Sequence, residues 1–293
     1  MNSDCNPELK LIIDAIRKSI IQISNLLRTY VPTGYSNKTN KSGDLVSHID
    51  IQSNEIVKNN LKWIQSVYAL SSEEEDSILH LNHDGKYVVV FDPLDGSQNL
   101  DCHLTTGSIF GIFLKHPGKL IYDLSGKDMI YASYGLYSSA TIYVECLNQC
   151  TLSILSSDNT FQLLQENIKM PEQSKYYYVN HSNKNRMNKE TTQLINKFMD
   201  NKKTNRWTGC MVADVHRLVM TGGFFCYPAD SKNTRGKLRV VYEILPMSYI
   251  VEKCGGQSRV SLGNNDSALD SLIGDEIHRK SPIYLAGSNN IGI

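Results

Sequence analysis

The sequence predicts a layered α/β protein of two domains, and three observations lead to this fold class. The chain has 293 residues, roughly twice the length of a typical domain. Apolar residues make up 41% and charged residues 20%, which is the composition of an ordinary folded protein. Short strand-type runs alternate with helical segments in the second half, a pattern typical of helices packed on sheets.

The composition also excludes several classes of function. The 30 Lys and Arg residues balance the 30 Asp and Glu residues, so the chain lacks the basic excess of nucleic-acid binders. No segment approaches the roughly 20 apolar residues that span a membrane, and residues 1–8 do not resemble a secretion signal. The seven cysteines form no CxxC pair, so we expect neither a disulfide framework nor a structural zinc site. These features indicate a reduced, cytoplasmic enzyme with no nucleic-acid or membrane partner.

Two helices and a polar loop open the chain. Apolar residues recur at helical spacing over residues 8–30, which predicts an amphipathic helix. Residues 32–43 are rich in Gly, Ser, Thr and Asn, and we expect a mobile loop there. Apolar spacing over about residues 50–63 predicts the second helix.

Short strands follow, and then a boundary. Apolar β-type runs are predicted as strands over residues 87–91, 109–114, 134–137, 140–144 and 152–155. The polar residues 166–175 contain a proline and are the expected boundary between domains of residues 1–173 and 174–293. Beyond it we expect strands over 176–179 and 223–227 and helices over 189–198, 211–220 and 241–254.

The clearest chemical signal stands where an apolar strand ends, in Tyr-Val-Val-Val-Phe-Asp-Pro-Leu-Asp-Gly-Ser over residues 87–97. A buried carboxylate such as Asp92 needs a compensating charge, and Mg²⁺ binds both carboxylate and phosphate oxygens. Pro93 restrains the backbone so that Asp95 turns toward the same point. The N–H groups of Gly96 and Ser97 suit an anion. The same residues are good turn formers, so the motif alone leaves a plain tight turn open.

Other acidic residues strengthen the metal interpretation, although each has a simpler alternative. Glu73 and Glu74 belong to an acidic run that a solvated surface would also explain. Asp44 and Asp50 lie where the polar loop meets the second helix, and Asp50 suits a helix N-cap. Glu243 ends an apolar run, and a solvent-facing helical glutamate is its alternative.

Taken together, these segments resemble the fructose-1,6-bisphosphatase family of Mg²⁺-dependent, lithium-sensitive sugar and inositol phosphatases. The matching blocks occur in the family's order between residues 43 and 256. They are GDLVSHIDIQSNEIV, LSSEEE, GKYVVVFDPLDGSQNLDCHLTTGSIFGIF, NRWTGCMVADVHR and GGFFCYPADSKNTRGKLRVVYEILPMSYIVEKCGG. The resemblance implies an αβαβα sandwich, with an N-terminal metal-binding domain and a C-terminal sugar-phosphate domain, that assembles into a homodimer or homotetramer.

The resemblance also implies roles for individual residues. The implied metal ligands are Glu73, Glu74, Asp92, Asp95, Glu243 and the carbonyl of Leu94. The implied catalytic residues are Asp50, Glu74 and Asp44, with Glu74 and Asp50 as the general base and Asp44 acting when its loop closes. The implied substrate contacts are Asp95, Gly96, Ser97, Asn180, Asn183, Arg206, Met211, Tyr227, Lys232 and Lys237. Asn180 and Asn183 are alternatives for one family position, and Arg206 matches an arginine that enters a neighbouring subunit's site.

The implied reaction is the hydrolysis of the 1-phosphate of fructose 1,6-bisphosphate to fructose 6-phosphate and phosphate, as in gluconeogenesis. The expected cofactor is Mg²⁺, or alternatively Mn²⁺, at two to three ions per site. A sedoheptulose-1,7-bisphosphatase is the nearest alternative, since Trp207 and Arg186 replace family tyrosines. An inositol monophosphatase-like enzyme and an inactive binding subunit are less favoured. Because Leu114 replaces a family arginine, we expect weak or absent AMP inhibition.

The remaining histidines and cysteines are interpreted as structural. His48, His103 and His216 lack the spacing of metal ligands. Cys102, Cys210, Cys226 and Cys254 lie in apolar contexts and are expected to be buried packing residues.

Overall fold

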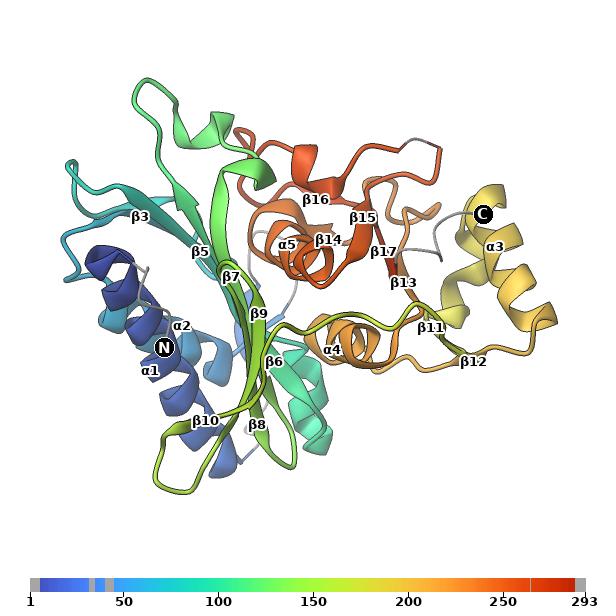
Figure 1. Ribbon diagram of the computed structural model, residues 1–293, viewed down its shortest axis with the longest axis horizontal. Helices are drawn as coiled ribbons and strands as arrows, with labels where there is room; N and C mark the ends of the chain where they lie inside the picture. The colour runs from blue at the N-terminus through green and yellow to red at the C-terminus, as the bar shows by residue number, and fades with distance from the viewer. Residues whose placement is uncertain (1–5, 32–34, 40–44, 264, 288–293) are drawn as a thin grey trace.

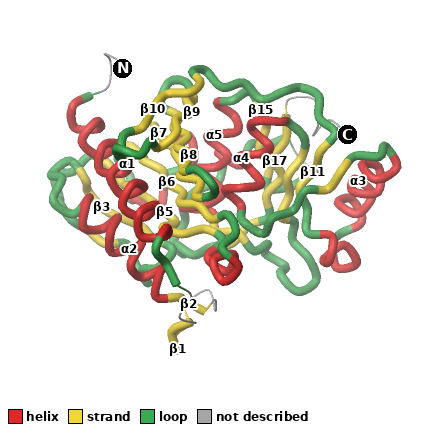
Figure 2. Tube along the Cα trace, turned by 90° about the horizontal axis from the view of Figure 1, so that it is seen from below, coloured by secondary structure: helices red, strands yellow, loops and turns green. Residues whose placement is uncertain are grey.

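The computed structural model describes residues 6–31, 35–39, 45–263 and 265–287. Helices and sheets alternate in five layers, and Figure 1 shows them in the order α1 and α2, a large sheet, α4 and α5, a smaller sheet, and α3. Figure 2 shows the first helical layer at one end of the molecule and α3 at the other. The predicted layered α/β fold with its αβαβα sandwich is therefore confirmed.

The first layer consists of α1 (Pro7–Arg28) and α2 (His48–Leu61). The Asn6 side chain accepts a hydrogen bond from the backbone N–H of Glu8, so α1 has the N-cap that orphaned N–H groups require. Isoleucines spaced three and four residues apart along α1 are fully buried against the large sheet. The predicted amphipathic helix is confirmed.

The large sheet has the order β10-β9-β8-β7-β6-β5-β3-β4, and only its β3–β5 pair is parallel. Its strands are β3 (Val67–Ser72), β4 (Leu79–His80), β5 (Tyr87–Asp95), β6 (Thr106–Leu114), β7 (Met129–Tyr137), β8 (Thr141–Cys146), β9 (Cys150–Leu155) and β10 (Phe161–Gln165). All nine residues of β5 are buried, because helices cover both faces of the sheet at this strand. The expected strands coincide with parts of the observed ones, although the strand expected over 140–144 begins one residue before β8, and β3, β4 and β10 were not predicted.

The smaller sheet has the order β12-β11-β13-β17-β15. Its strands are β11 (Tyr176–Tyr178), β12 (Thr204–Asn205), β13 (Phe224–Tyr227), β15 (Gly256–Arg259) and β17 (Ile283–Gly287). A separate pair joins β14 (Leu238–Arg239) to β16 (Lys280–Ser281). The chain passes from the large sheet to this one over residues 166–175, where the domain boundary is predicted.

Helices α4 (Met211–Thr221) and α5 (Leu245–Lys253) lie between the two sheets, and α3 (Lys189–Asp200) covers the far face of the smaller one. The helix expected over residues 241–254 is divided into a π-helical turn, η5 (Val240–Ile244), and α5. Short 3₁₀ helices are η1 (Ser97–Cys102), η2 (Ile121–Asp123), η3 (Gly126–Asp128), η4 (His181–Arg186) and η6 (Ala268–Asp270). No described helix is long and apolar enough to cross a membrane.

Three sequence-based expectations are wrong. The segment expected to be a loop contains β1 (Tyr35–Thr39), which pairs with β2 (Leu45–Ser47), because backbone pairing does not require an apolar core. Cys146 and Cys150 form a disulfide, since the antiparallel register of β8 and β9 places them opposite one another. Cys102 is exposed, because it lies in the surface turn η1. The other three cysteines named above are buried, as expected.

Candidate active site

A cleft opens where the carboxyl ends of β3 and β5 meet the start of α4 and the turn η5. Sequence-predicted residues that line it are Asp50, Glu73, Glu74, Asp92, Leu94, Asp95, Gly96, Ser97, Met211, Tyr227, Lys237 and Glu243. The other lining residues are Gln98, Trp207, Gly209, Leu238 and Arg239. Segments more than 150 residues apart in the sequence, such as those of Asp92 and Glu243, therefore meet here.

Three buried carboxylates form the floor of the cleft. Oxygen atoms of Asp92, Asp95 and Glu243 all lie within 4.8 Å of one another, and the residues are 2%, 9% and 2% exposed. Burial raises the pKa of Asp92 and Asp95, and it raises the pKa of Glu243 to about 8. Three acids this close cannot all ionise unless a cation compensates them. The solvent-facing alternative for Glu243 is therefore wrong.

The backbone turns Asp92 and Asp95 toward one another. The register between β5 and β6 is irregular between these two residues, and Ser108 Oγ donates a hydrogen bond of 2.6 Å to the carbonyl of Pro93. Asp92 Oδ1 accepts from the backbone N–H of Leu94 at 2.9 Å. The motif is therefore both a tight turn and part of the carboxylate cluster, because the turn brings Asp92 and Asp95 together.

Asp95 lies at the amino end of α4. Its Oδ2 accepts hydrogen bonds from the backbone N–H of Val212 at 2.7 Å and from Cys210 Sγ at 3.0 Å. A helix N-terminus stabilises a negative charge, so the helix favours the ionised form of this buried acid. Gly96 follows with φ of 72°, and a Cβ added there would lie 2.7 Å from Cys210 Cβ. Only glycine lets the strand turn so close to the helix.

Arg239 is the principal cleft residue that sequence reasoning missed. Its guanidinium lies 2.6 Å from Glu73 Oε1 and 3.7 Å from Glu243 Oε2, and its backbone N–H donates to Glu243 Oε2 at 2.6 Å. The residue is only 6% exposed. An arginine inside the apolar run Leu-Arg-Val-Val, four residues before Glu243, was the available signal, because a buried arginine requires acidic partners.

Asp50 lies in the first turn of α2 and also lines the cleft. The N-cap of α2 is Ser47, so the N-cap alternative for Asp50 is wrong. Asp50 is instead the third helical residue, and its Oδ2 accepts from the backbone N–H and the hydroxyl of Ser47 at 2.9 and 2.8 Å. Its Oδ1 is buried without a hydrogen-bond partner among the described residues. Burial raises the pKa of Asp50 to about 6.

The loop after β3 is tied to the opposite wall of the cleft. The backbone N–H of Glu73 donates to the carbonyl of Phe91 at 3.2 Å. His278 Nε2 lies 3.1 Å from the carbonyl of Glu75, and His278 Nδ1 lies 2.7 Å from the hydroxyl of Tyr242. Because a carbonyl only accepts, Nε2 carries the proton and Tyr242 donates to Nδ1. His278, which the sequence did not single out, thus connects the Glu73–Glu74 loop to η5.

Aromatic and basic side chains form the outer wall. Lys237 Nζ lies 5.8 Å from the ring centroid of Tyr227, and the Trp207 ring lies edge-on to Tyr227 at 5.4 Å. Trp207 therefore retains an aromatic ring where the family resemblance implies a tyrosine. The cleft therefore combines acidic and basic side chains.

Four predicted substrate contacts do not line the cleft of this chain, and their role stays a prediction. The Asn180 side chain caps η4 by accepting from the backbone N–H of Ser182, and Asn183 accepts from Arg186. Lys232 is exposed beyond the cleft, and Arg206 is exposed as well. Asp44 lies outside the described residues. His216, by contrast, is packed against Tyr134 by a 2.9 Å hydrogen bond, which agrees with its expected structural role.

The donor set fits a divalent metal. The acids of the floor, with Glu73 and Glu74 beside them, provide only hard oxygen ligands, which Mg²⁺ and Mn²⁺ prefer over sulfur or nitrogen. Lys237 adds a positive charge to the same cleft, which suits an anionic ligand. The fold and this site define a metal-dependent phosphatase.

The chain belongs to the fructose-1,6-bisphosphatase family. The model of the family's N-terminal domain matches residues 2–166, and that of the C-terminal domain matches residues 170–292. The chain is 35% identical to fructose-1,6-bisphosphatase 1 of Rattus norvegicus, covering 99% of this chain and 80% of the relative. It is 38% identical to the cytosolic fructose-1,6-bisphosphatase of Musa acuminata, covering 88% and 78%.

Solved structures agree with this assignment. The fructose-1,6-bisphosphatase of Leishmania major in its holo form superposes with a TM-score of 0.92 at 32% identity, covering 99% of this chain and 94% of the other. The T-state of the same enzyme gives a TM-score of 0.85 at 29% identity, covering 100% and 93%. The fold described here is therefore the fold of that family.

Proposed function

We propose that this protein hydrolyses the 1-phosphate of fructose 1,6-bisphosphate, releasing fructose 6-phosphate and phosphate with the help of Mg²⁺. The observation that carries the proposal is the convergence of Asp92, Asp95 and Glu243 on one focus in a cleft that also holds Lys237. The family assignment favours this substrate over sedoheptulose bisphosphate and over monophosphates.

The acidic floor would hold the metal. Two to three Mg²⁺ ions, or Mn²⁺ in their place, would supply Lewis-acid stabilisation of the phosphate and of the leaving oxygen when bound. The residues proposed as ligands are Glu73, Glu74, Asp92, Asp95, Glu243 and the carbonyl of Leu94. Arg239 keeps two of these acids in place between turnovers, since its guanidinium pairs with Glu73 and its backbone N–H donates to Glu243.

Asp50, together with Glu74, is the proposed general base. Oδ2 of Asp50 is held by Ser47, which leaves Oδ1 free to accept a proton from the attacking water. A carboxylate whose pKa is raised to about 6 is a stronger base than an ordinary aspartate, yet it is mostly ionised at neutral pH. We propose that Asp44 assists from the loop that precedes α2.

The other end of the cleft binds the sugar and the second phosphate. Lys237 supplies positive charge, while Met211 and Tyr227 give apolar surface to the sugar. We propose that Arg206 completes a neighbouring copy's cleft in a homodimer or homotetramer, which its exposed position supports. The backbone N–H groups of Gly96 and Ser97 orient the reacting phosphate. We place the enzyme in the cytoplasm, in gluconeogenic sugar-phosphate metabolism.

Initial rates of phosphate release test the proposal. We expect turnover of fructose 1,6-bisphosphate with Mg²⁺, and at least tenfold lower kcat/KM for sedoheptulose 1,7-bisphosphate and for inositol monophosphate. Asp92→Asn, which keeps the shape of the side chain, serves as the control and is expected to abolish release. A preference for the seven-carbon sugar would overturn the substrate, and no release with Mg²⁺ or Mn²⁺ would overturn the enzyme.

A further inference from the structure

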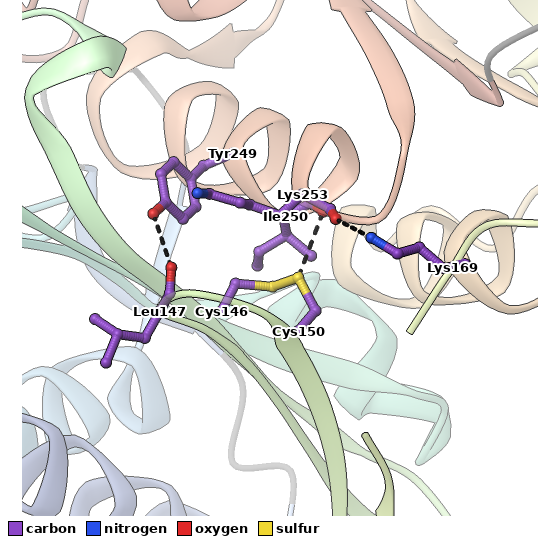
Figure 3. The surroundings of a disulfide bond; sticks show 7 residues. All are labelled: Cys146, Leu147, Cys150, Lys169, Tyr249, Ile250 and Lys253. Atoms are coloured by element: carbon purple, nitrogen blue, oxygen red, sulfur yellow. Dashed lines mark hydrogen bonds between the residues drawn. A yellow bond between two sulfur atoms is a disulfide. The ribbon is translucent and has the colours of Figure 1, made fainter. Parts of the chain in front are cut away.

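Three cysteines from three different elements meet on the side of the large sheet that faces α5. Cys146 ends β8, Cys150 begins β9, and Cys254 follows the last turn of α5. Their sulfur atoms all lie within 4.8 Å of one another, and each residue is at most 1% exposed. Figure 3 shows the Cys146–Cys150 disulfide pointing toward α5.

The backbone around the three sulfurs is held by a set of hydrogen bonds. The N–H of Ile168 donates to the carbonyl of Cys150 at 2.9 Å, and the N–H of Met170 donates to the carbonyl of Cys254 at 2.8 Å. A three-residue segment therefore spans the distance between the hairpin and α5. The hydroxyl of Tyr249 on α5 also donates to the carbonyl of Leu147, in the hairpin turn, at 3.2 Å. None of these hydrogen bonds involves the disulfide sulfurs, so reduction does not remove them directly.

We propose that Cys146, Cys150 and Cys254 form a binding site for one thiophilic divalent cation of the zinc group, which becomes available when the Cys146–Cys150 disulfide is reduced. Two sulfurs bound to one tetrahedral zinc lie about 3.8 Å apart, since each Zn–S bond is about 2.3 Å. The three sulfurs lie within 4.8 Å of one another, and the two disulfide sulfurs move apart on reduction to reach this separation. The carbonyl oxygen of Ile250 lies 3.8 Å from Cys150 Sγ but already accepts the backbone N–H of Cys254 at 3.0 Å, so the three sulfurs are the protein ligands that this site offers.

The charges favour a divalent ion. Three thiolates and one divalent cation leave a single negative charge, and the Lys169 ammonium lies beside the cluster, 3.4 Å from the carbonyl of Lys253. An all-sulfur side-chain set selects soft ions such as Zn²⁺ and Cd²⁺ and discriminates against Mg²⁺. This site and the oxygen-lined cleft therefore accept different metals.

Metal binding at this site requires reduction of the disulfide first. A dithiol reductant breaks the S–S bond, transferring two electrons and two protons, and is itself oxidised to a disulfide. The cation then replaces the protons of three thiols, which pass to solvent. Burial raises the pKa of the Cys254 thiol to about 12, so without a cation it stays protonated. Binding would therefore weaken as the pH falls.

Cadmium titration tests the proposal, because sulfur-to-cadmium charge transfer gives an ultraviolet absorption that carboxylate sites lack. The full-length protein is reduced with dithiothreitol, desalted under nitrogen and titrated with Cd²⁺ in excess Mg²⁺. We expect one Cd²⁺ per chain with this absorption, at least 100-fold weaker binding in Cys254→Ser, and unchanged binding in Cys226→Ser. Cys226 is the matched control, since it is a buried free cysteine in the other sheet.

The untreated, disulfide-containing protein is expected to give no such absorption. If the reduced wild type lacks the absorption, the three cysteines are packing residues and the proposal is wrong. Equal binding by Cys254→Ser, or by the disulfide form, would also overturn it. None of these measurements depends on phosphatase activity, so this inference stands or falls separately from the proposed function.

Discussion

Arg239 provides the sharpest test of how the acidic floor is stabilised. The residue is buried, and its guanidinium contacts Glu73 at 2.6 Å and Glu243 at 3.7 Å. Replacing Arg239 with Met keeps much of the apolar volume but removes the positive charge. Removing one partner of a buried ion pair typically costs about 3–5 kcal/mol, because the other charge stays buried without compensation.

A bound metal would take over that compensation. We therefore expect Arg239→Met to lower the free energy of unfolding by about 3–5 kcal/mol in EDTA, and by less than about half of that in saturating Mg²⁺. Urea denaturation followed by circular dichroism measures both values. Arg235→Met is the control, since Arg235 forms only an exposed ion pair with Glu276 at 3.6 Å and its loss costs less than about 1 kcal/mol.

Comparing the loss of unfolding free energy in EDTA with that in Mg²⁺ tests whether Arg239 and a metal compensate the same acids. If Arg239→Met is destabilised equally with and without Mg²⁺, the guanidinium does not share the floor with a metal. A loss no larger than that of Arg235→Met would refute the argument that Arg239 compensates buried carboxylates.

Three further predictions concern the cleft and the N-terminal helix. Asp50→Asn is expected to lower kcat about 10²–10⁴-fold with its circular dichroism unchanged, because the amide cannot accept the proton of water; a loss below threefold would exclude Asp50 as the base. In EDTA, the raised pKa of Glu243 means that its contribution to stability is present below its unfolded pKa and is lost as the pH rises through about 8. Glu243→Gln should therefore gain stability relative to wild type between pH 5 and 8 in urea denaturation, and a constant difference would contradict this. AMP at millimolar concentration is expected to inhibit weakly, because Leu114 offers no charge and because Lys86, the AMP-site lysine that the family resemblance implies, is paired with Glu8 of α1 at 2.9 Å; inhibition at micromolar concentration in rate assays would disprove it.

Local sequence patterns predicted much of the fold. The isoleucine spacing of α1 and the apolar run of β5 specify their elements, since burying those side chains on one face is the main gain available to them. The short strands β4, β12, β14 and β16 have two residues each and no periodicity to detect. Tertiary pairing alone makes them strands, so no sequence pattern could have revealed them.

The active-site acids were partly visible in the sequence. Asp92 and Asp95 lie in one short motif whose turn chemistry is local, so their convergence follows from adjacent residues. Glu73 and Glu243 were assigned through the family resemblance, and the structure places both beside the motif. The contact of Arg239 with Glu73 could not be inferred, because it joins β14 to the loop after β3 across 166 residues of sequence.

The cysteine cluster likewise depends on the tertiary structure and not on local sequence. The sequence by itself determined a two-domain α/β protein with no formal net charge and with an acidic motif suited to phosphate chemistry, because composition and near-neighbour spacing control those properties. Only the tertiary structure brought Cys254 to the Cys146–Cys150 pair, freed one oxygen of Asp50, and left Asn180 at a helix cap. Such outcomes depend on how whole layers pack, and packing is a property of surfaces that are assembled from distant parts of the chain.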